Sequence, residues 1–272
     1  MRYLPLFALL LLAACAAPES AEPEAPMTVA MDYAPVETKA DSVALAALNA
    51  SGGADALAAL RYLRFNFGFD RNGEVSVGRE HLWDRVTGRY RVEWEGGEDS
   101  TYVVLFNVND HEAGQTYLNG QAVAEEDNAS LLQRAYSGYI NDTYWLLFPA
   151  KLLDPGVNRA YIADSSNAER DVITLTFEGV GLTPGDTYWV YVDKASGLVN
   201  QWAFRLQNAD ADSEPRFYKW LDYQALQTPA GPVNLSPRKE SPNGTFALLT
   251  DALNAPASVE DALFTDPMPR LD

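Results

Sequence analysis

Few side chains in this sequence have the type and spacing that catalysis requires. The 272 residues include two histidines, His81 and His111, which lie in different predicted elements. We expect His81 to be a partly buried strand residue rather than a general base. Gly-x-Ser-x-Gly, His-Glu-x-x-His, cysteine pairs and phosphate-binding loops are absent from the sequence. The chain is therefore predicted not to be an enzyme, and no cofactor is expected.

Two groups of carboxylates could still carry chemistry. Asp84 and Glu93 are a candidate acid and base for a hydrolase, although no motif accompanies them. Asp210, Asp212 and Glu214 offer the oxygen ligands that calcium prefers, but they lack the spacing and the glycine of an EF-hand loop. We interpret this second group as a solvated hairpin tip, and no metal site is predicted.

The single cysteine, Cys15, is placed for covalent lipidation. Residues 1–15 are MRYLPLFALLLLAAC, in which a basic start precedes an apolar run too short to span a bilayer. Residues 12–15 resemble the lipobox of bacterial lipoproteins, which implies removal of residues 1–14 as a signal peptide and lipidation of the thiol. Ala16 after the cysteine indicates an outer-membrane lipoprotein, with its periplasmic or surface exposure left open. The alternative is an ordinary signal peptide with a chance cysteine.

Composition divides the rest of the chain. Residues 15–40 are rich in Ala, Pro and Glu, which predicts a lipid anchor followed by a disordered tether. Residues 41–250 are expected to form the folded domain, and residues 251–272 a loose C-terminal tail. The net charge of −18 disfavours nucleic acid as a partner. The membrane is then reached through the N-terminal lipid.

The folded region alternates apolar and polar residues as antiparallel strands do. In residues 63–69 the large apolar side chains face one way, and Gly73 permits the tight turn that follows. Helices are expected at 41–50, capped by Asp41 or Ser42, and at 54–60. The remaining strands are predicted at 75–84, 90–94, 101–108, 159–164, 172–178, 187–193, 198–207, 216–223 and near 246–249. The pattern indicates a mainly β protein with helices (α+β).

Helical spacing interrupts the strands in the middle of the chain. Residues 130–139 are predicted to be helical, and Asn141 or Asp142 is expected to cap a second short helix. This second helix would carry the most apolar run outside the N-terminus, residues 144–153. Because a sheet with one apolar face needs a cover, we expect this stretch to lie on the sheet.

Two motifs resemble a known superfamily. The hairpin at residues 192–198, VDKASGL, resembles a turn of the outer-membrane lipoprotein carriers and receptors (LolA/LolB-like). Residues 141–157, together with the helix around 46–53 and the strand at 63–65, resemble a bacterial secreted or lipoprotein family of unknown function within that superfamily. The resemblance covers residues 41–234. It implies an open antiparallel half-barrel with helices covering the concave face, and acyl-chain binding in that concavity.

Aromatic side chains are the remaining functional candidates. The chain has 6 Trp, 14 Tyr and 11 Phe, most of which core packing explains. The predicted ligand-binding residues are Tyr144, Trp145, Leu147, Phe148, Trp94 and Trp189, and the ligand would be an acyl chain or a lipidated protein. The alternative is a carbohydrate- or protein-interaction module of the envelope, which would place Trp and Tyr on the outer face. Which face of the sheet carries the tryptophans separates the two hypotheses.

Overall fold

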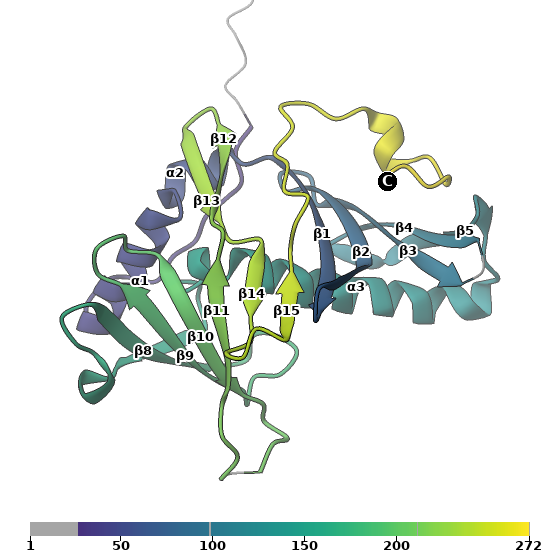
Figure 1. Ribbon diagram of the computed structural model, residues 1–272. Coiled ribbons are helices and arrows are strands. Elements are labelled where there is room, and N and C mark those ends of the chain that lie inside the picture. Colours follow the sequence, from purple (N-terminus) through teal and green to yellow (C-terminus); the bar gives the residue numbers. More distant parts are fainter. Residues whose placement is uncertain (1–26, 98, 211, 272) are drawn as a thin grey trace, which may run out of the picture.

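The computed structural model describes residues 27–271 except residues 98 and 211. The predicted signal peptide, residues 1–14, and the lipidation site Cys15 lie outside the described residues. The described chain forms a curved 13-stranded antiparallel sheet whose strand order is β6-β5-β4-β3-β2-β1-β15-β14-β11-β10-β9-β8-β7. The end strands β6 and β7 are not paired with each other, so the sheet is open. Figure 1 shows the long helix α3 behind the sheet, which confirms the predicted open half-barrel with a helical cover.

Two meanders supply most of the strands. The first contains β1 (Tyr62–Arg71), β2 (Glu74–Asp84), β3 (Arg89–Gly97), β4 (Ser100–Asn107), β5 (Asp110–Leu118) and β6 (Gln121–Ala122). The second contains β7 (Val157–Tyr161), β8 (Arg170–Phe177), β9 (Thr187–Asp193), β10 (Val199–Arg205) and β11 (Arg216–Leu221). These bounds agree with the predicted strands to within a few residues, because alternating burial and glycine turns both act locally.

Two late strands join the meanders into one sheet. β15 (Phe246–Leu249) pairs with β1, with Gly68 opposite Leu249. β14 (Arg238–Glu240) pairs with β15 and with β11. The strand expected near residues 246–249 is therefore confirmed, whereas β14 and the separate hairpin of β12 (Gln224–Thr228) and β13 (Gly231–Leu235) were not predicted. These short strands were missed because the region contains frequent prolines, which argue against a strand in a sequence.

The first helices cover one end of the concave face. α1 (Lys39–Ala50) begins with a capping box, in which the Thr38 hydroxyl accepts from the Asp41 amide and the Asp41 carboxylate accepts from the Thr38 amide. The expected cap at Asp41 or Ser42 is therefore wrong, since the helix starts earlier. α2 (Gly53–Ala59) follows as predicted.

The central cover is one helix rather than two. α3 (Glu125–Leu147) runs through Asn141 and Asp142 without a break, and the 3-10 turn η1 (Phe148–Ala150) ends it at Pro149. The predicted cap fails because the Asp142 carboxylate faces the sheet and binds Arg79 instead of a helix amide. Thr143 donates its hydroxyl proton to the Tyr139 carbonyl one turn back, which lets a polar residue stay inside the helix.

The predicted disordered tether is too long where the structure describes it. The amide of Val29 donates to the Ala58 carbonyl, and the amide of Ala34 donates to the Leu153 carbonyl, both at 2.8 Å. Met31 and Tyr33 pack against the main core. Residues 29–34 therefore belong to the fold, although their composition suggested otherwise.

The predicted loose tail is docked. We call residues 251–271 the C-terminal segment; in Figure 1 it runs from the top of β15 to a position above β1–β3, and it packs on the convex face, opposite α3. Phe264, at the end of the short helix η3 (Asp261–Phe264), and Leu271, near the end of the segment, form one apolar cluster with Tyr62 and Leu82 of the sheet. The segment lacks any periodic apolar pattern, which is why composition alone suggested a tail.

The core lies mainly on the concave side. The largest apolar cluster joins α1, α2 and η1 to β1, β7–β11, β13 and β15. A second cluster packs the first half of α3 against β3 and β4. Among the described residues, no helix has the length and hydropathy needed to cross a membrane.

Candidate functional site

The end of α3 places a dense group of aromatic side chains in the concavity. Tyr144, Trp145 and Phe148 come from α3 and η1, and they meet aromatic residues of β9, β10 and β11. We define the concave aromatic cluster as Tyr144, Trp145, Phe148, Tyr188, Trp202, Phe204 and Tyr218. The stretch expected to cover the sheet therefore does so.

Trp202 is the centre of the cluster. Phe148 stacks on it with ring centroids 4.5 Å apart and an interplanar angle of 6°. Trp145 lies 4.4 Å from it and also meets Tyr218 edge-on at 5.5 Å. Such offset and edge-on contacts add to the stabilisation that burial alone supplies.

Exposure divides the cluster into a floor and a rim. The floor consists of Phe148, Trp202 and Phe204, which are 0%, 2% and 8% exposed. The rim consists of Tyr144, Trp145, Tyr188 and Tyr218, all of which are half-buried. The floor is filled by the protein's own side chains, while the rim keeps apolar surface in contact with solvent.

The tyrosines of the cluster are neutral hydrogen-bonding groups. Burial raises the pKa of the Tyr144 and Tyr188 hydroxyls far above the usual value, and the nearby Asp186 carboxylate adds to the effect at Tyr188. The Tyr188 hydroxyl donates to Asp186 at 3.0 Å. The concavity therefore offers aromatic surface and a few hydrogen-bonding groups, and the buried side chains of Asp186 and Lys239 lie beside Tyr188 and Trp220.

The structure brings together four of the six predicted ligand-binding residues. Tyr144, Trp145 and Phe148 belong to the concave aromatic cluster, and Leu147 is buried in the same core. Trp94 lies in the second cluster, beneath the first half of α3 and under the Arg134 guanidinium. Trp189 does not face the concavity, because its neighbours Tyr188 and Val190 do, and it stacks instead with Arg205 on the convex face.

The positions of the other tryptophans show which face of the sheet carries the aromatic side chains. Trp83, Trp94, Trp145, Trp202 and Trp220 all pack into the clusters on the concave side. Trp189 is the exception. This distribution favours an apolar concavity over a surface of aromatic side chains on the convex face.

A buried polar cluster, which the sequence did not predict, ties α3 to the first meander. Asp142 accepts from Arg79 through two hydrogen bonds of 2.6 and 3.0 Å. Nε2 of His81 lies 3.0 Å from the same carboxylate, although the angle there falls outside hydrogen-bond geometry. The Tyr90 hydroxyl lies 2.8 Å from Nδ1 of His81. We name these four residues the Asp142 cluster.

The protonation states in the Asp142 cluster follow from burial and charge. Burial lowers the pKa of His81 below its usual value, and it raises the pKa of Tyr90 so that the hydroxyl stays protonated. Burial would also raise the pKa of Asp142, but His81 and Arg79 outweigh it and hold that pKa low. Tyr90 is then the donor to Nδ1, which leaves the His81 proton on Nε2, toward Asp142. The interpretation of His81 as a strand histidine is consistent with this placement, and its burial is complete.

The carboxylates considered for hydrolysis are each bound to arginine. Asp84 contacts Arg61 and Arg89, and Glu93 contacts Arg91. Both carboxylates therefore stabilise the fold in this arrangement. Asp210, Asp212 and Glu214 are exposed in the loop after β10. Among the residues that the structure describes, no group of three or more His, Cys, Asp and Glu side chains is placed to hold a metal ion.

Comparisons with known proteins give structural neighbours. No protein-family model matches the chain, and no curated protein matches it. A DUF1329 family protein from Desulfovibrio piger is similar in structure, with 9% identity over 84% of this chain and 98% of that chain and a TM-score of 0.45. A LolA superfamily protein from Nitrosomonas europaea is similar with 11% identity over 85% of this chain and 99% of that chain and a TM-score of 0.37. The structural neighbours of this chain thus include a member of the superfamily that its sequence resembles.

Proposed function

We propose that the protein is a non-enzymatic, lipid-anchored protein of the outer membrane that binds a hydrophobic ligand in the half-barrel concavity. The ligand would be an acyl chain, either free or attached to a lipidated partner. The observation that supports this proposal best is the concave aromatic cluster, which has a buried floor and a half-buried rim.

The rim supplies the first contact surface. Trp145, Tyr144, Tyr188 and Tyr218 present aromatic faces next to one another, and grouped apolar surface of this kind is typical of binding sites. Each Å² of apolar surface that a hydrocarbon chain covers contributes about 25 cal/mol. An acyl chain lying along the rim would therefore gain affinity without needing a charged partner.

Deeper entry requires the cover to move. Phe148 occupies the floor, and residues 151–156 after η1 form a run of turns that ends at Gly156, whose φ is 81°. In this proposal residues 144–150, which are the end of α3 and η1, shift while the first half of α3 stays on β3 and β4. In this proposal the Asp142 cluster holds the helix just before the part that moves.

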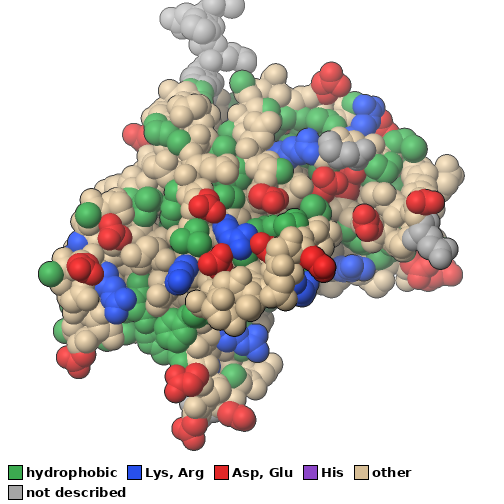
Figure 2. Space-filling model, viewed as in Figure 1, with side chains coloured by type: hydrophobic (Ala, Val, Ile, Leu, Met, Phe, Trp, Pro, Cys, Tyr) green, Lys and Arg blue, Asp and Glu red, His purple; other side chains and the backbone are tan. Residues whose placement is uncertain are grey.

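A second candidate function is an interaction module on the convex face. Trp189, Tyr191 and Phe217 are half-buried there, with Trp189 and Phe217 on either side of Ala203 in the strand register. Figure 2 shows hydrophobic surface over β9 and β10 on this face. This patch would suit a protein or glycan partner, and the test below includes it as an outcome.

A photoactivatable palmitate analogue tests the proposal. The full chain is placed in lipid nanodiscs, labelled with the diazirine analogue with and without excess palmitate, and mapped by peptide mass spectrometry. We expect competable labelling on residues 136–150 and 199–205. Trp145→Ala should reduce it severalfold, whereas Trp189→Ala, the same change on the convex face, should not. If labelling is confined to peptides of β9 and β11, and only Trp189→Ala removes this labelling, the result would favour the interaction module. Labelling that palmitate does not compete with would refute the acyl-chain site.

Lipid anchorage has its own test. Labelled palmitate should enter the wild-type chain in bacteria and should not enter Cys15→Ser. Equal incorporation into both would remove the anchor from the proposal, and recovery of the chain in the inner-membrane fraction would contradict the outer-membrane location.

A further inference from the structure

An extended segment near the start of the described chain lies against the elements that cover the concavity. We call residues 29–34 the N-terminal strap. Val29, Met31 and Tyr33 are half-buried, and the residues between them are exposed, which is the alternation of an extended chain lying on a surface. Met31 and Tyr33 pack against the same core as Phe148 of the cover.

The strap joins two elements on the concave side. The Val29 amide donates to the carbonyl of Ala58 in α2, and the Ala34 amide donates to the carbonyl of Leu153, each at 2.8 Å. Leu153 lies in the run of turns that follows η1 directly. Because the chain is continuous, residues 144–150 can move far only if these turns move or bend with them. The strap therefore holds the part of the chain to which the cover is attached.

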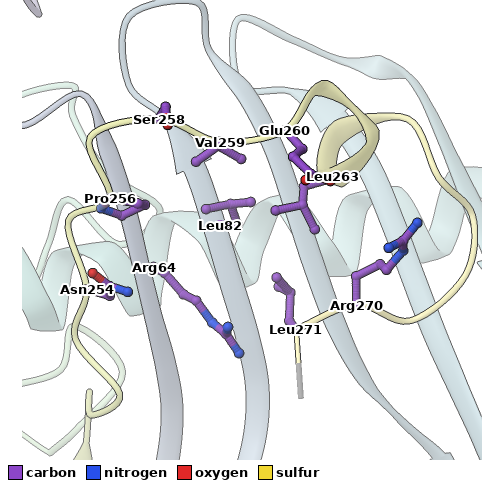
Figure 3. Close-up of a pocket in the computed structure, with 10 residues that line it drawn as sticks. All are labelled: Arg64, Leu82, Asn254, Pro256, Ser258, Val259, Glu260, Leu263, Arg270 and Leu271. Carbon is purple, nitrogen blue, oxygen red and sulfur yellow. The ribbon is translucent and has the colours of Figure 1, made fainter.

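The strap is held by few backbone hydrogen bonds. Among the residues that the structure describes, these two are the only backbone hydrogen bonds that the strap forms. In the C-terminal segment, Asn254 alone forms as many with Arg64, at 2.9 and 3.0 Å, and Figure 3 shows Leu263 and Leu271 next to Leu82 of the sheet. Segments with few such bonds open at a small cost in free energy. The strap can therefore detach while the rest of the fold remains.

The Tyr33 hydroxyl makes the attached state of the strap less favourable. It is buried and has no hydrogen-bond partner among the described residues. Burial raises the pKa of Tyr33 to about 12, and the Asp154 carboxylate adds to this effect, so the hydroxyl keeps its proton at neutral pH. A buried donor without an acceptor is unfavourable, and water satisfies this hydroxyl once the strap detaches.

The end of the strap that leads into α1 is fixed. The Asp41 carboxylate accepts from the amides of Glu37 and Thr38 at 3.2 and 2.9 Å, and it also accepts from Nε of Arg159 at 2.6 Å. A strap that has left Leu153 thus remains attached at residues 37–38 and can return to its place.

We propose that the N-terminal strap is a latch for the cover. Residues 144–150 leave the concavity only after the Ala34 amide has released the Leu153 carbonyl. The strap then sets the rate at which an acyl chain reaches the floor of the concavity. This consequence rests on the function proposed above, whereas the movement of the cover can be measured without a ligand.

Hydrogen exchange of the full chain in lipid nanodiscs, without added ligand, tests the latch. Ala34→Pro removes the amide that donates to Leu153. Ala30→Pro is the matched control, because Ala30 is exposed and its amide has no hydrogen-bond partner among the described residues. We expect exchange in residues 144–156 to be about two- to tenfold faster in Ala34→Pro and unchanged in Ala30→Pro. Exchange in residues 251–271 should not change in either variant.

Tyr33→Phe tests the latch in the opposite direction. It removes the unsatisfied hydroxyl and keeps the ring, so it favours the attached strap. Exchange in residues 144–156 should become about two- to tenfold slower, while a residue that only supports the fold would give no such protection.

Labelling with the diazirine palmitate analogue separates the latch from the proposed function. Labelling of residues 199–205 should be faster in Ala34→Pro and slower in Tyr33→Phe. If exchange responds as expected and no chain is labelled, the acyl-chain function is refuted and the latch stands.

Four results would overturn the latch. Exchange in residues 144–156 could stay unchanged in Ala34→Pro, or Ala30→Pro could accelerate it equally. Exchange could rise across the whole sheet in Ala34→Pro, which would make the strap a support for the entire fold. Labelling could also keep the wild-type rate while exchange in the cover changes, which would show that the strap does not limit entry.

Discussion

The two faces of the sheet are covered by different physical means. On the concave face, residues 144–150 are held by aromatic packing of Phe148 and Trp145 on Trp202. On the convex face, the C-terminal segment is held by Arg91, whose guanidinium donates to the carbonyls of Leu263, Asp266 and Met268. Glu93 completes this attachment by accepting from the Arg270 amide. Aromatic side-chain packing thus holds the concave cover, whereas on the convex face hydrogen bonds to the backbone add to the apolar contacts of Phe264 and Leu271.

The largest expected effect is on the concave face. Phe148→Ala should lower the free energy of unfolding by about 3–5 kcal/mol, because it removes a fully buried ring from a stacked position and leaves a cavity. Urea denaturation monitored by tryptophan fluorescence measures the change.

Trp189→Ala is the matched control for this prediction. It truncates a large aromatic side chain on the convex face, where the ring is half-buried and stacks mainly on Arg205. We expect a loss of about 1 kcal/mol or less. A loss equal to that of Phe148→Ala would mean that the two faces do not differ as described.

The convex attachment should be weaker and local. Arg91→Met removes a fully buried guanidinium and leaves the buried Glu93 carboxylate without its ion-pair partner, so we expect a loss of about 3 kcal/mol, the lower end of the range for breaking a buried ion pair. Amide hydrogen exchange should become much faster in residues 251–271 and little faster in α3, because only one cover is released.

Arg134→Met is the control, because it removes an arginine that does not hold the C-terminal segment. Arg134 is exposed and lies over the Trp94 ring, away from the C-terminal segment. It should leave exchange in residues 251–271 unchanged. Uniformly faster exchange across the sheet in Arg91→Met would show that Arg91 supports the whole fold instead of one segment.

The smallest expected effect is the dependence of folding stability on pH, which arises from the Asp142 cluster. The folded chain binds a proton at His81 less readily than the unfolded chain, so stability should fall as the pH drops below about 6.5. Asp142 has a lowered pKa, so its contribution is present above about pH 4 and is lost only in more acidic solution. Between pH 7.5 and 5.5 the wild type should lose at most about 1.4 kcal/mol from His81, the loss for a histidine that stays uncharged in the folded chain.

Two variants isolate that contribution. His81→Gln should flatten the dependence of the urea midpoint between pH 7.5 and 5.5. His111→Gln changes the other histidine, leaves the Asp142 cluster intact, and should keep the slope of the wild type. If His81→Gln retains the full slope, the Asp142 cluster does not govern the pH response.

The strands and the aromatic cover could be predicted because their signals are local. Alternation in residues 63–69 and the apolar run around Trp145 each lie within one element. Trp189 was misplaced because β9 is apolar on both faces, so alternation does not tell the inner side from the outer. The unbroken helix at Asp142 and the docking of the C-terminal segment depend on Arg79 and Arg91, which are distant in sequence from what they bind.

The late position of β14 and β15 also sets the order in which this chain can fold. β1 is synthesised early, but one of its two neighbouring strands is β15. The edge of β1 that pairs with β15 therefore stays unpaired until residue 249 has been synthesised. Until then the two meanders are separate sheets with open inner edges at β1 and β11, the kind of edge that invites pairing with another chain. Contacts this far apart in sequence slow folding. A chain stopped before residue 238 would retain nearly all of its aromatic core and still lack the two strands that join the halves.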